Sequence, residues 1–236
     1  ALTDFGKNYT YGKLNALVHK RRAALCRPAK GRPYVLVGDN RLDVFVTLYA
    51  LLEERIPFLL LHPTLTEHEK EALLKQIHAI DAPIPDGVAA VLMTSGTTGT
   101  PKPAMLTRSA LAASAWSSAQ NIALTKHDAW LMSLSVSRIG GLSILTRSLA
   151  ARSRVVLFPH FCSREFICAL KENAVTLASI VPTMLAKLLE EFPDFKPESS
   201  LRAILLGGSF ASRTLLDDAR GPVSYTHLRA HETVLD

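Results

Sequence analysis

The chain has 236 residues, of which 48% are hydrophobic and 20% charged, an ordinary composition for a globular protein with a buried core. Its formal charge of +6 is spread along the sequence, and only 7% of residues are aromatic, which disfavours a nucleic-acid partner. No apolar run approaches the roughly 20 residues of a membrane helix, and that from Ile56 to Leu61 contains Pro57, so no membrane span is expected.

The cysteines and the N-terminal residues indicate the cellular compartment of the protein. The three cysteines and eight histidines show no spacing typical of a metal site, and an odd number of cysteines fits a reducing cytoplasm better than a disulfide framework. At the N-terminus, Asp4, Lys7 and Asn8 interrupt any apolar signal segment. Because the chain begins at Ala1 without a Met, we expect the native N-terminus to lie upstream.

Helices and strands alternate in the first third of the chain. The apolar spacing predicts a helix over 9–25, a strand over 34–37, a helix over 42–54, a strand over 58–61 and a helix over 66–79. Thr66 and Glu69 have the spacing of a capping box at the start of the last helix. Such alternation predicts parallel βαβ units and therefore an α/β fold.

The most informative stretch follows a linker over 81–87. A buried strand ending at Val91–Met93 runs into a loop of small residues that is closed by a lysine, and Lys102 is flanked by prolines. Glycines allow backbone N–H groups to approach an anion, hydroxyls add donors and a lysine adds charge, so this loop is predicted to bind phosphate. The flanking prolines exclude a Walker P-loop. The alternative is a surface linker. The predicted phosphate-binding residues are Thr94, Ser95, Gly96, Thr97, Thr98, Gly99 and Lys102.

The rest of the chain repeats the alternation. We expect helices over 109–120, 139–150, 161–172, 184–191 and 212–220, and strands over 131–134, 155–158, 175–180 and 200–206. Glycines at 140–141 follow a strand, where a helix N-terminus can face an anion, although they could equally permit close packing. Pro182 and Thr183 are typical of a helix start.

The run from Thr94 to Lys102 resembles the nucleotide-binding signature of the adenylate-forming enzymes, which include acyl- and aryl-CoA ligases, peptide-synthetase adenylation domains and luciferases. The resemblance implies mostly parallel sheets flanked by helices, as part of a large N-terminal domain. It also implies a two-step reaction. A carboxylate and ATP form an acyl-adenylate and pyrophosphate, and the thiolate of coenzyme A then displaces AMP. In this family the loop covers the β- and γ-phosphates, and the Thr98 hydroxyl would lie near Mg²⁺.

A second motif is similar to the o-succinylbenzoate-CoA ligase branch of that family, which acts in menaquinone synthesis. Leu134, the stretch 139–141 and Arg147 fit the pattern, whereas Arg138 replaces its His and two serines replace a Pro and an aromatic residue. Two arginines would suit a substrate with two carboxylates. The resemblance implies a substrate site formed by Arg138, Gly141, Arg147, Pro182, Thr183, Gly207, Gly208 and Ser209.

The last residues differ in character from the rest. From Val223 the sequence resembles a translated sequencing adapter, so we divide the chain into residues 1–222, a partial AMP-binding domain, and a non-native tail over 223–236. The resemblance covers about the first half of a whole enzyme and implies that the fragment is inactive alone. Expected partners are a small carboxylic acid, ATP and CoA, and a homo-oligomer is left open. Two alternatives remain: another acyl-CoA synthetase or adenylation domain, or a non-catalytic nucleotide-binding remnant.

Overall fold

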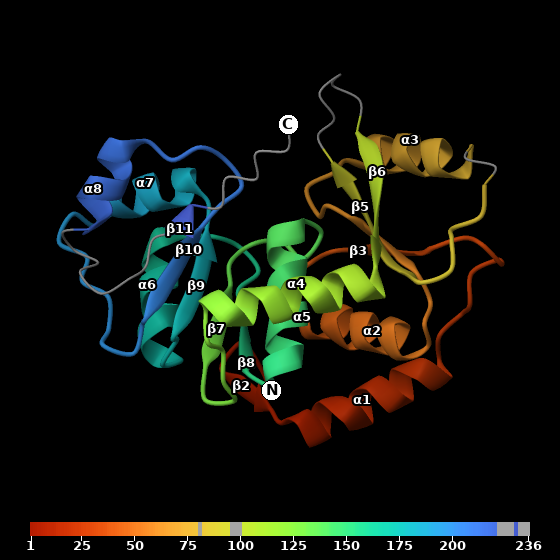
Figure 1. The fold of residues 1–236 in the computed structure, drawn as a ribbon, viewed down its shortest axis with the longest axis horizontal. Coiled ribbons are helices and arrows are strands. Elements are labelled where there is room, and N and C mark those ends of the chain that lie inside the picture. The colour runs from red at the N-terminus through yellow and green to blue at the C-terminus, as the bar shows by residue number, and fades with distance from the viewer. Residues whose placement is uncertain (80–81, 95–100, 221–228, 231–236) are drawn as a thin grey trace.

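A computed structural model describes residues 1–79, 82–94, 101–220 and 229–230. Over these residues the chain forms two sheets with helices around and between them (Figure 1). The large sheet has the strand order β11-β10-β9-β7-β8-β1-β2, and the small sheet has the order β3-β4-β5-β6. The pairings are parallel except for β1–β2 and β5–β6, which confirms the expected mostly parallel α/β fold.

The strands of the large sheet are β1 (Leu2–Asp4), β2 (Lys7–Tyr9), β7 (Ala129–Met132), β8 (Arg154–Leu157), β9 (Leu177–Ile180), β10 (Ala203–Leu206) and β11 (Arg229–Ala230). Those of the small sheet are β3 (Tyr34–Val37), β4 (Phe58–Leu61), β5 (Val88–Thr94) and β6 (Lys102–Thr107). The helices are α1 (Tyr11–Ala23), α2 (Leu42–Glu53), α3 (Glu67–His78), α4 (Arg108–Asn121), α5 (Ile139–Ala151), α6 (Ser163–Glu172), α7 (Pro182–Glu191) and α8 (Arg213–Arg220).

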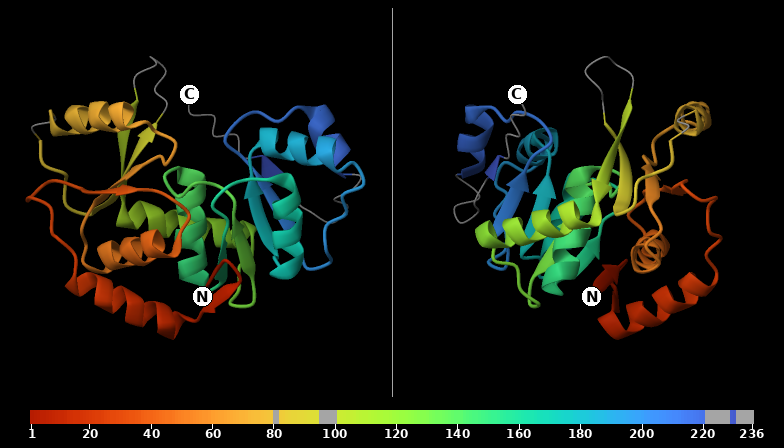
Figure 2. Two further views of the ribbon diagram at one scale, coloured as in Figure 1. Left: turned by 180° about the vertical axis from the view of Figure 1, so that it is seen from behind. Right: turned by 45° about the vertical axis from the view of Figure 1, so that its right-hand side comes forward.

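One hydrophobic cluster joins the two sheets through the helices that lie between them (Figure 2). Leu60 of the small sheet, Trp130 and Met132 of the large sheet, and Leu142 of α5 belong to this cluster, together with Leu111 of α4. Because these side chains are almost fully buried, removing them from water holds the sheets in one body. The relative position of the two sheets is therefore part of the folded core.

The outer face of the large sheet is also covered, and that of the small sheet is covered over β4 and β5, whereas Val35 and Val37 of β3 are exposed. Phe166 of α6 and Leu185 of α7 pack on the face of the large sheet that faces away from α5. On the small sheet, Leu73 and Ile77 of α3 cover the corresponding face. The result is a layered arrangement of helices, large sheet, helices, small sheet and helix (Figures 1 and 2). No helix in the described part of the chain is long and apolar enough to cross a membrane.

The predicted boundaries hold to within about two residues for most elements. The capping box is confirmed, because the Thr66 N–H donates to Glu69 Oε2 at 2.7 Å and the Glu69 N–H donates to Thr66 Oγ1 at 3.3 Å. The predicted start of α7 was wrong. Val181 is the N-cap and Pro182 is the first helical residue, where a proline loses no hydrogen bond.

Three strands were missed, and each lacks a strong apolar pattern. β1 and β2 are three residues each and are joined by a turn with positive φ at Phe5 and Gly6. β6 is an edge strand with half-buried and exposed side chains, and it contains Pro103. An edge strand tolerates a proline because its outward N–H has no ladder partner. The tail prediction is not tested: β11 pairs with β10, and residues 221–228 and 231–236 lie outside the described residues.

Candidate functional site

The carboxyl ends of several parallel strands carry most of the predicted site residues. Thr94 ends β5, Arg138 follows β7, Pro182 follows β9 and Gly207 follows β10. In open α/β sheets ligands bind beyond the carboxyl ends of the strands. The fold therefore gathers segments that lie far apart in the sequence at one edge, as the phosphate-loop prediction requires.

The loop end of the β5–β6 hairpin, where β5 ends and β6 begins, is formed by Thr94 and Lys102. These residues are partners in the antiparallel register, and the Thr94 hydroxyl donates to the Lys102 carbonyl at 3.1 Å. Both side chains are exposed, so the Lys102 ammonium is accessible to an anion. Gln76 of α3 donates to the Pro101 carbonyl at 3.1 Å and fixes the hairpin from the outside. The predicted phosphate-binding residues Ser95–Gly99, including Thr98 as the metal-binding hydroxyl, lie outside the described residues.

Arg138 lies beside this hairpin. It is the exposed N-cap residue of α5, and its Nη1 donates to the carbonyl of Met93 at 3.4 Å. His62 follows β4, and the parallel register that pairs Leu60 with Leu92 carries it toward Thr94. Burial and the nearby Arg138 charge lower the pKa of His62. Sequence reasoning missed His62, although a titratable residue directly after a buried strand is a usable signal.

Arg147 lies deeper, on the α5 face toward the large sheet. Its guanidinium is 6.0 Å from the ring centroid of Trp130, and its Nε is enclosed without a hydrogen-bond acceptor. Burial lowers its pKa, and no carboxylate forms an ion pair with it in the part of the chain that the structure describes. Arg138 and Arg147 are nine residues apart on the helix, about 13 Å along its axis. Their guanidinium groups contact different elements, the Met93 carbonyl on β5 for Arg138 and the Trp130 ring on β7 for Arg147.

Gly141 has a packing role that the sequence left open. A Cβ at this position would lie 2.2 Å from the Ser135 carbonyl oxygen, so only glycine lets α5 approach the turn before it. At Gly140 a Cβ would approach only the Leu134 Cδ1, at 3.0 Å. These distances support the close-packing interpretation, and a substrate contact of Gly141 stays a prediction.

The two remaining predicted segments, at 181–183 and 207–209, meet at the ends of β9 and β10. The Gly207 N–H donates to the Ile180 carbonyl at 3.3 Å. Gly208 has φ +88°, and a Cβ there would lie 3.1 Å from the Val181 side chain. Thr183 and Ser209 are exposed at the same edge. The structure therefore brings these segments together, and their contact with a substrate stays a prediction.

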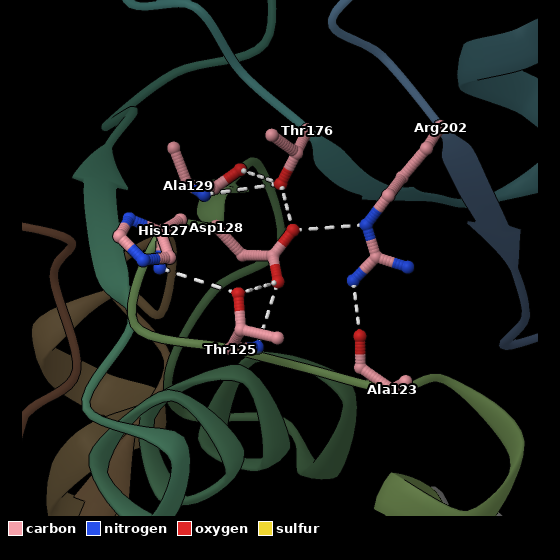
Figure 3. A network of polar contacts seen from close by, with 7 residues as sticks. All are labelled: Ala123, Thr125, His127, Asp128, Ala129, Thr176 and Arg202. Atoms are coloured by element: carbon pink, nitrogen blue, oxygen red, sulfur yellow. Dashed lines mark hydrogen bonds and ion pairs between the residues drawn. The ribbon is translucent and has the colours of Figure 1, made fainter.

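A buried polar network lies at the opposite, amino-terminal edge of the large sheet (Figure 3). Asp128 accepts hydrogen bonds from the Thr125 N–H at 2.7 Å, the Thr176 hydroxyl at 2.8 Å and Arg202 Nε at 2.9 Å. Arg202 also donates to the Ala123 carbonyl at 2.6 Å. Burial alone would raise the pKa of Asp128, but these donors lower it on balance. The network joins the starts of β7, β9 and β10. Its role is therefore structural.

Other features of the surface do not add to the site. Hollows of about 430 and 240 Å³ lie between α7 and α8 and at the amino-terminal edge of the small sheet, and neither is lined by a predicted site residue. Within the described residues no three His, Cys, Asp or Glu side chains are grouped to hold a metal. The candidate site is therefore the carboxyl edge with the cationic side chains of Lys102 and Arg138, whereas Arg147 lies deeper, beside Trp130.

Comparison with known proteins agrees with this geometry. The model of the AMP-binding enzyme family matches residues 77–224, more than half of the chain. The chain belongs to the AMP-binding enzyme family. The chain is 41% identical over 135 residues to the 2-succinylbenzoate–CoA ligase of Bacillus licheniformis, a match that covers 57% of this chain and 28% of the relative.

Solved structures of a related enzyme share the fold. The o-succinylbenzoate CoA synthetase of Bacillus subtilis, as a double mutant bound to a product analogue, superposes with a TM-score of 0.81 at 28% identity, covering 94% of this chain and 53% of that one. The same synthetase in complex with ATP and magnesium ion gives a TM-score of 0.80 at 28% identity, over 94% and 54% of the two chains. This AMP-binding enzyme chain thus spans about half the length of these solved relatives.

Proposed function

We propose that the complete protein containing this chain is an ATP-dependent acid-CoA ligase that acts on o-succinylbenzoate. The observation that carries the proposal is the pairing of Thr94 with Lys102 at the loop end of the β5–β6 hairpin. Thr94 and Lys102 are the first and last residues of the nine-residue nucleotide-binding signature, in a chain that belongs to the AMP-binding enzyme family. The relatives named 2-succinylbenzoate–CoA ligase support the choice of acid.

ATP would bind with its phosphates over the hairpin. Lys102 is exposed there, so its ammonium can neutralise the charge that develops on pyrophosphate as the bond to the α-phosphate breaks. Mg²⁺ would be held mainly by the phosphate oxygens and by the Thr98 hydroxyl. The related synthetase, solved in complex with ATP and magnesium ion, supports the presence of Mg²⁺ together with ATP. No general base is needed, because the attacking carboxylate is already ionised at neutral pH.

The carboxylic acid would bind toward Arg147. Within the described residues this half-buried guanidinium has no carboxylate partner, which is costly in the free protein, and an anionic ligand would remove that cost. Its stacking over Trp130 holds the planar group in one orientation. Arg138, Gly141 and the exposed groups of Thr183 and Ser209 would border the same path from the carboxyl edge.

The second half-reaction would use coenzyme A, whose thiolate attacks the acyl-adenylate and releases AMP. We place the protein in the cytoplasm, because its three cysteines are exposed free thiols, which a reducing compartment preserves. Its partners would be the acid, ATP and CoA.

The test is exchange of labelled pyrophosphate into ATP, catalysed by the complete protein with a panel of carboxylic acids. We expect exchange that depends on o-succinylbenzoate and falls when Lys102 is replaced by Met. If another acid supports exchange and o-succinylbenzoate does not, the protein is a different acyl-CoA synthetase or adenylation enzyme. ATP binding without exchange for any acid would favour a nucleotide-binding remnant.

A further inference from the structure

Asn40 is a buried side chain that joins the two sheets at their carboxyl edges. It lies in the loop between β3 of the small sheet and α2, and it is 3% exposed. Its Nδ2 donates to the Met132 carbonyl at 3.0 Å, to the Leu134 carbonyl at 3.0 Å and to the Phe158 carbonyl at 3.3 Å. Its Oδ1 accepts the N–H of Val136 at 3.1 Å. One amide thus satisfies groups at the ends of β7 and β8 and in the turn that follows β7.

No other side chain of similar size could make this set of contacts. The amide supplies two N–H groups for three carbonyls, so one N–H is shared between two of them, and its oxygen accepts the remaining backbone N–H. An aspartate at position 40 would place its charge against three carbonyl oxygens. An alanine would leave buried backbone groups without partners, which costs about 1–3 kcal/mol for each group.

Contacts beside Asn40 tie the same turn to the small sheet. The Ser135 hydroxyl donates to the Gly38 carbonyl at 3.1 Å, and the hydroxyls of Ser135 and Ser137 are 2.7 Å apart. A Cβ on Gly38 would lie 2.7 Å from the Ser137 Cβ, so the two segments are in close contact. The Gly38 N–H in turn donates to the Leu61 carbonyl at 2.8 Å. The turn is therefore anchored to both β3 and β4.

The anchored turn ends at Arg138. Its guanidinium donates a hydrogen bond to the carbonyl of Met93, the residue of β5 that directly precedes Thr94. The backbone path from Asn40 to this guanidinium is short, since Val136 is bonded to Asn40 and lies two residues before Arg138. A shift of the turn would move Arg138 relative to Thr94 and Lys102. Small misplacements of a charged group near a reacting centre are costly for catalysis.

We propose that Asn40 is a positioning residue, which fixes the turn over 133–137 against the small sheet and so places the Arg138 guanidinium beside the phosphate hairpin. This inference rests on the proposed ligase function. Asn40 itself would contact neither ATP nor the acid. It would set the distance between Arg138 and the hairpin residues Thr94 and Lys102, which are proposed to contact them. The large sheet carries one part of the site and the small sheet the other, so a buried link between them acts on both.

The experiment compares Asn40→Ala, Arg138→Ala and the double variant in the complete protein, by kcat/KM for the acid and by Tm. We expect each single variant to lower kcat/KM by about tenfold or more, and the double variant to stay within about threefold of Arg138→Ala. The Tm losses should instead add. Multiplicative kinetic effects would overturn the proposal, because Asn40 would then act independently of Arg138.

A matched control separates positioning from stability. Asp128→Asn removes a buried polar link of similar connectivity at the opposite edge of the large sheet. It should lower Tm while leaving kcat/KM within about twofold of the wild type. If Asp128→Asn and Asn40→Ala change kcat/KM equally at equal Tm loss, Asn40 is only structural. Should Asn40→Ala fail to fold, Gly38→Ala displaces the same turn through the Ser137 contact and replaces it in the comparison.

A second readout does not depend on enzyme activity. The imidazole of His62 senses the Arg138 charge. NMR titration of His62 should therefore show the same upward change in pKa for Asn40→Ala as for Arg138→Ala. An unchanged His62 titration in Asn40→Ala would overturn the inference. If the wild-type protein shows no ligase activity at all, the proposed function fails, and this titration still tests the position of Arg138.

Discussion

The guanidinium of Arg147 lies over the indole of Trp130, 6.0 Å from the ring centroid, with its Nε enclosed and without an acceptor. The indole N–H itself donates to the Ser179 hydroxyl at 3.0 Å, which fixes the ring on β7. The pair thus combines a positive charge with a rigid aromatic surface inside the protein. Binding of a carboxylate at Arg147 would change the surroundings of Trp130 directly.

This geometry gives a direct binding assay. This 236-residue chain has two tryptophans, and Trp116 is 70% exposed on α4, so Trp116→Phe, together with Phe at any tryptophan outside this chain, leaves Trp130 as the fluorescent residue. We expect o-succinylbenzoate to change this fluorescence with saturation. Arg147→Met should weaken acid binding by about 10- to 150-fold, because a charge-assisted hydrogen bond contributes about 1.5–3 kcal/mol. ATP affinity should change little. Equal acid affinity in the Arg147→Met variant would remove Arg147 from the site.

A second prediction concerns the turn that precedes α5. Gly141→Ala should destabilise the complete protein by about 3 kcal/mol, because the new Cβ would lie 2.2 Å from the Ser135 carbonyl oxygen. The matched control is Gly140→Ala. Its Cβ meets only the flexible Leu134 side chain, and the helix gains about 0.5–1 kcal/mol from losing a glycine. Chemical denaturation measures both, and equal stabilities would contradict the packing interpretation.

The sequence was a good guide to the elements and a poorer guide to their connections. Apolar spacing predicted α2 and β4 because both are buried and regular, and it predicted the strand that leads to Thr94, but not the hairpin that β5 forms with the strand after it. β6 was not predicted, since an edge strand needs no continuous apolar face. Periodicity carries no information about which loops meet. The contacts of Asn40 with three segments around residues 132–158 therefore became visible only in the fold.

The Asp128 network predicts a specific pH dependence of stability. The hydrogen bonds from Arg202, Thr125 and Thr176 outweigh burial and lower the pKa of Asp128 in the folded protein. Its contribution is therefore complete above the unfolded pKa of about 3.9 and is lost as pH falls through the lower folded value. Asp128→Asn should cost about 1.5–3 kcal/mol at neutral pH.

The measurement is urea denaturation of the wild type and of Asp128→Asn between pH 7 and the acid limit of folding. The difference in unfolding free energy should be constant at neutral pH and should shrink below about pH 4. A difference that stays the same across this range would show that the carboxylate charge of Asp128 does not stabilise the fold.

His62 gives the last prediction, which links ion binding to protonation. Burial and then the Arg138 charge lower its pKa, so the folded protein resists protonation of this imidazole. The imidazole Nδ1 already accepts the Thr64 N–H at 3.3 Å, which favours the neutral ring. For a His with a lowered folded pKa, stability is complete above the unfolded value of about 6.5 and declines as pH falls through the window below it.

Two changes should act on this pKa in the same direction for different reasons. Arg138→Ala removes a neighbouring positive charge, and ATP bound at the hairpin adds negative charge, so each should raise the pKa of His62 in an NMR titration. Arg164→Ala on α6 of the large sheet is a suitable control and should leave the titration unchanged. If ATP binds and the His62 titration does not move, the phosphates do not lie beside β4. The nucleotide would then have to be assigned to another part of the carboxyl edge.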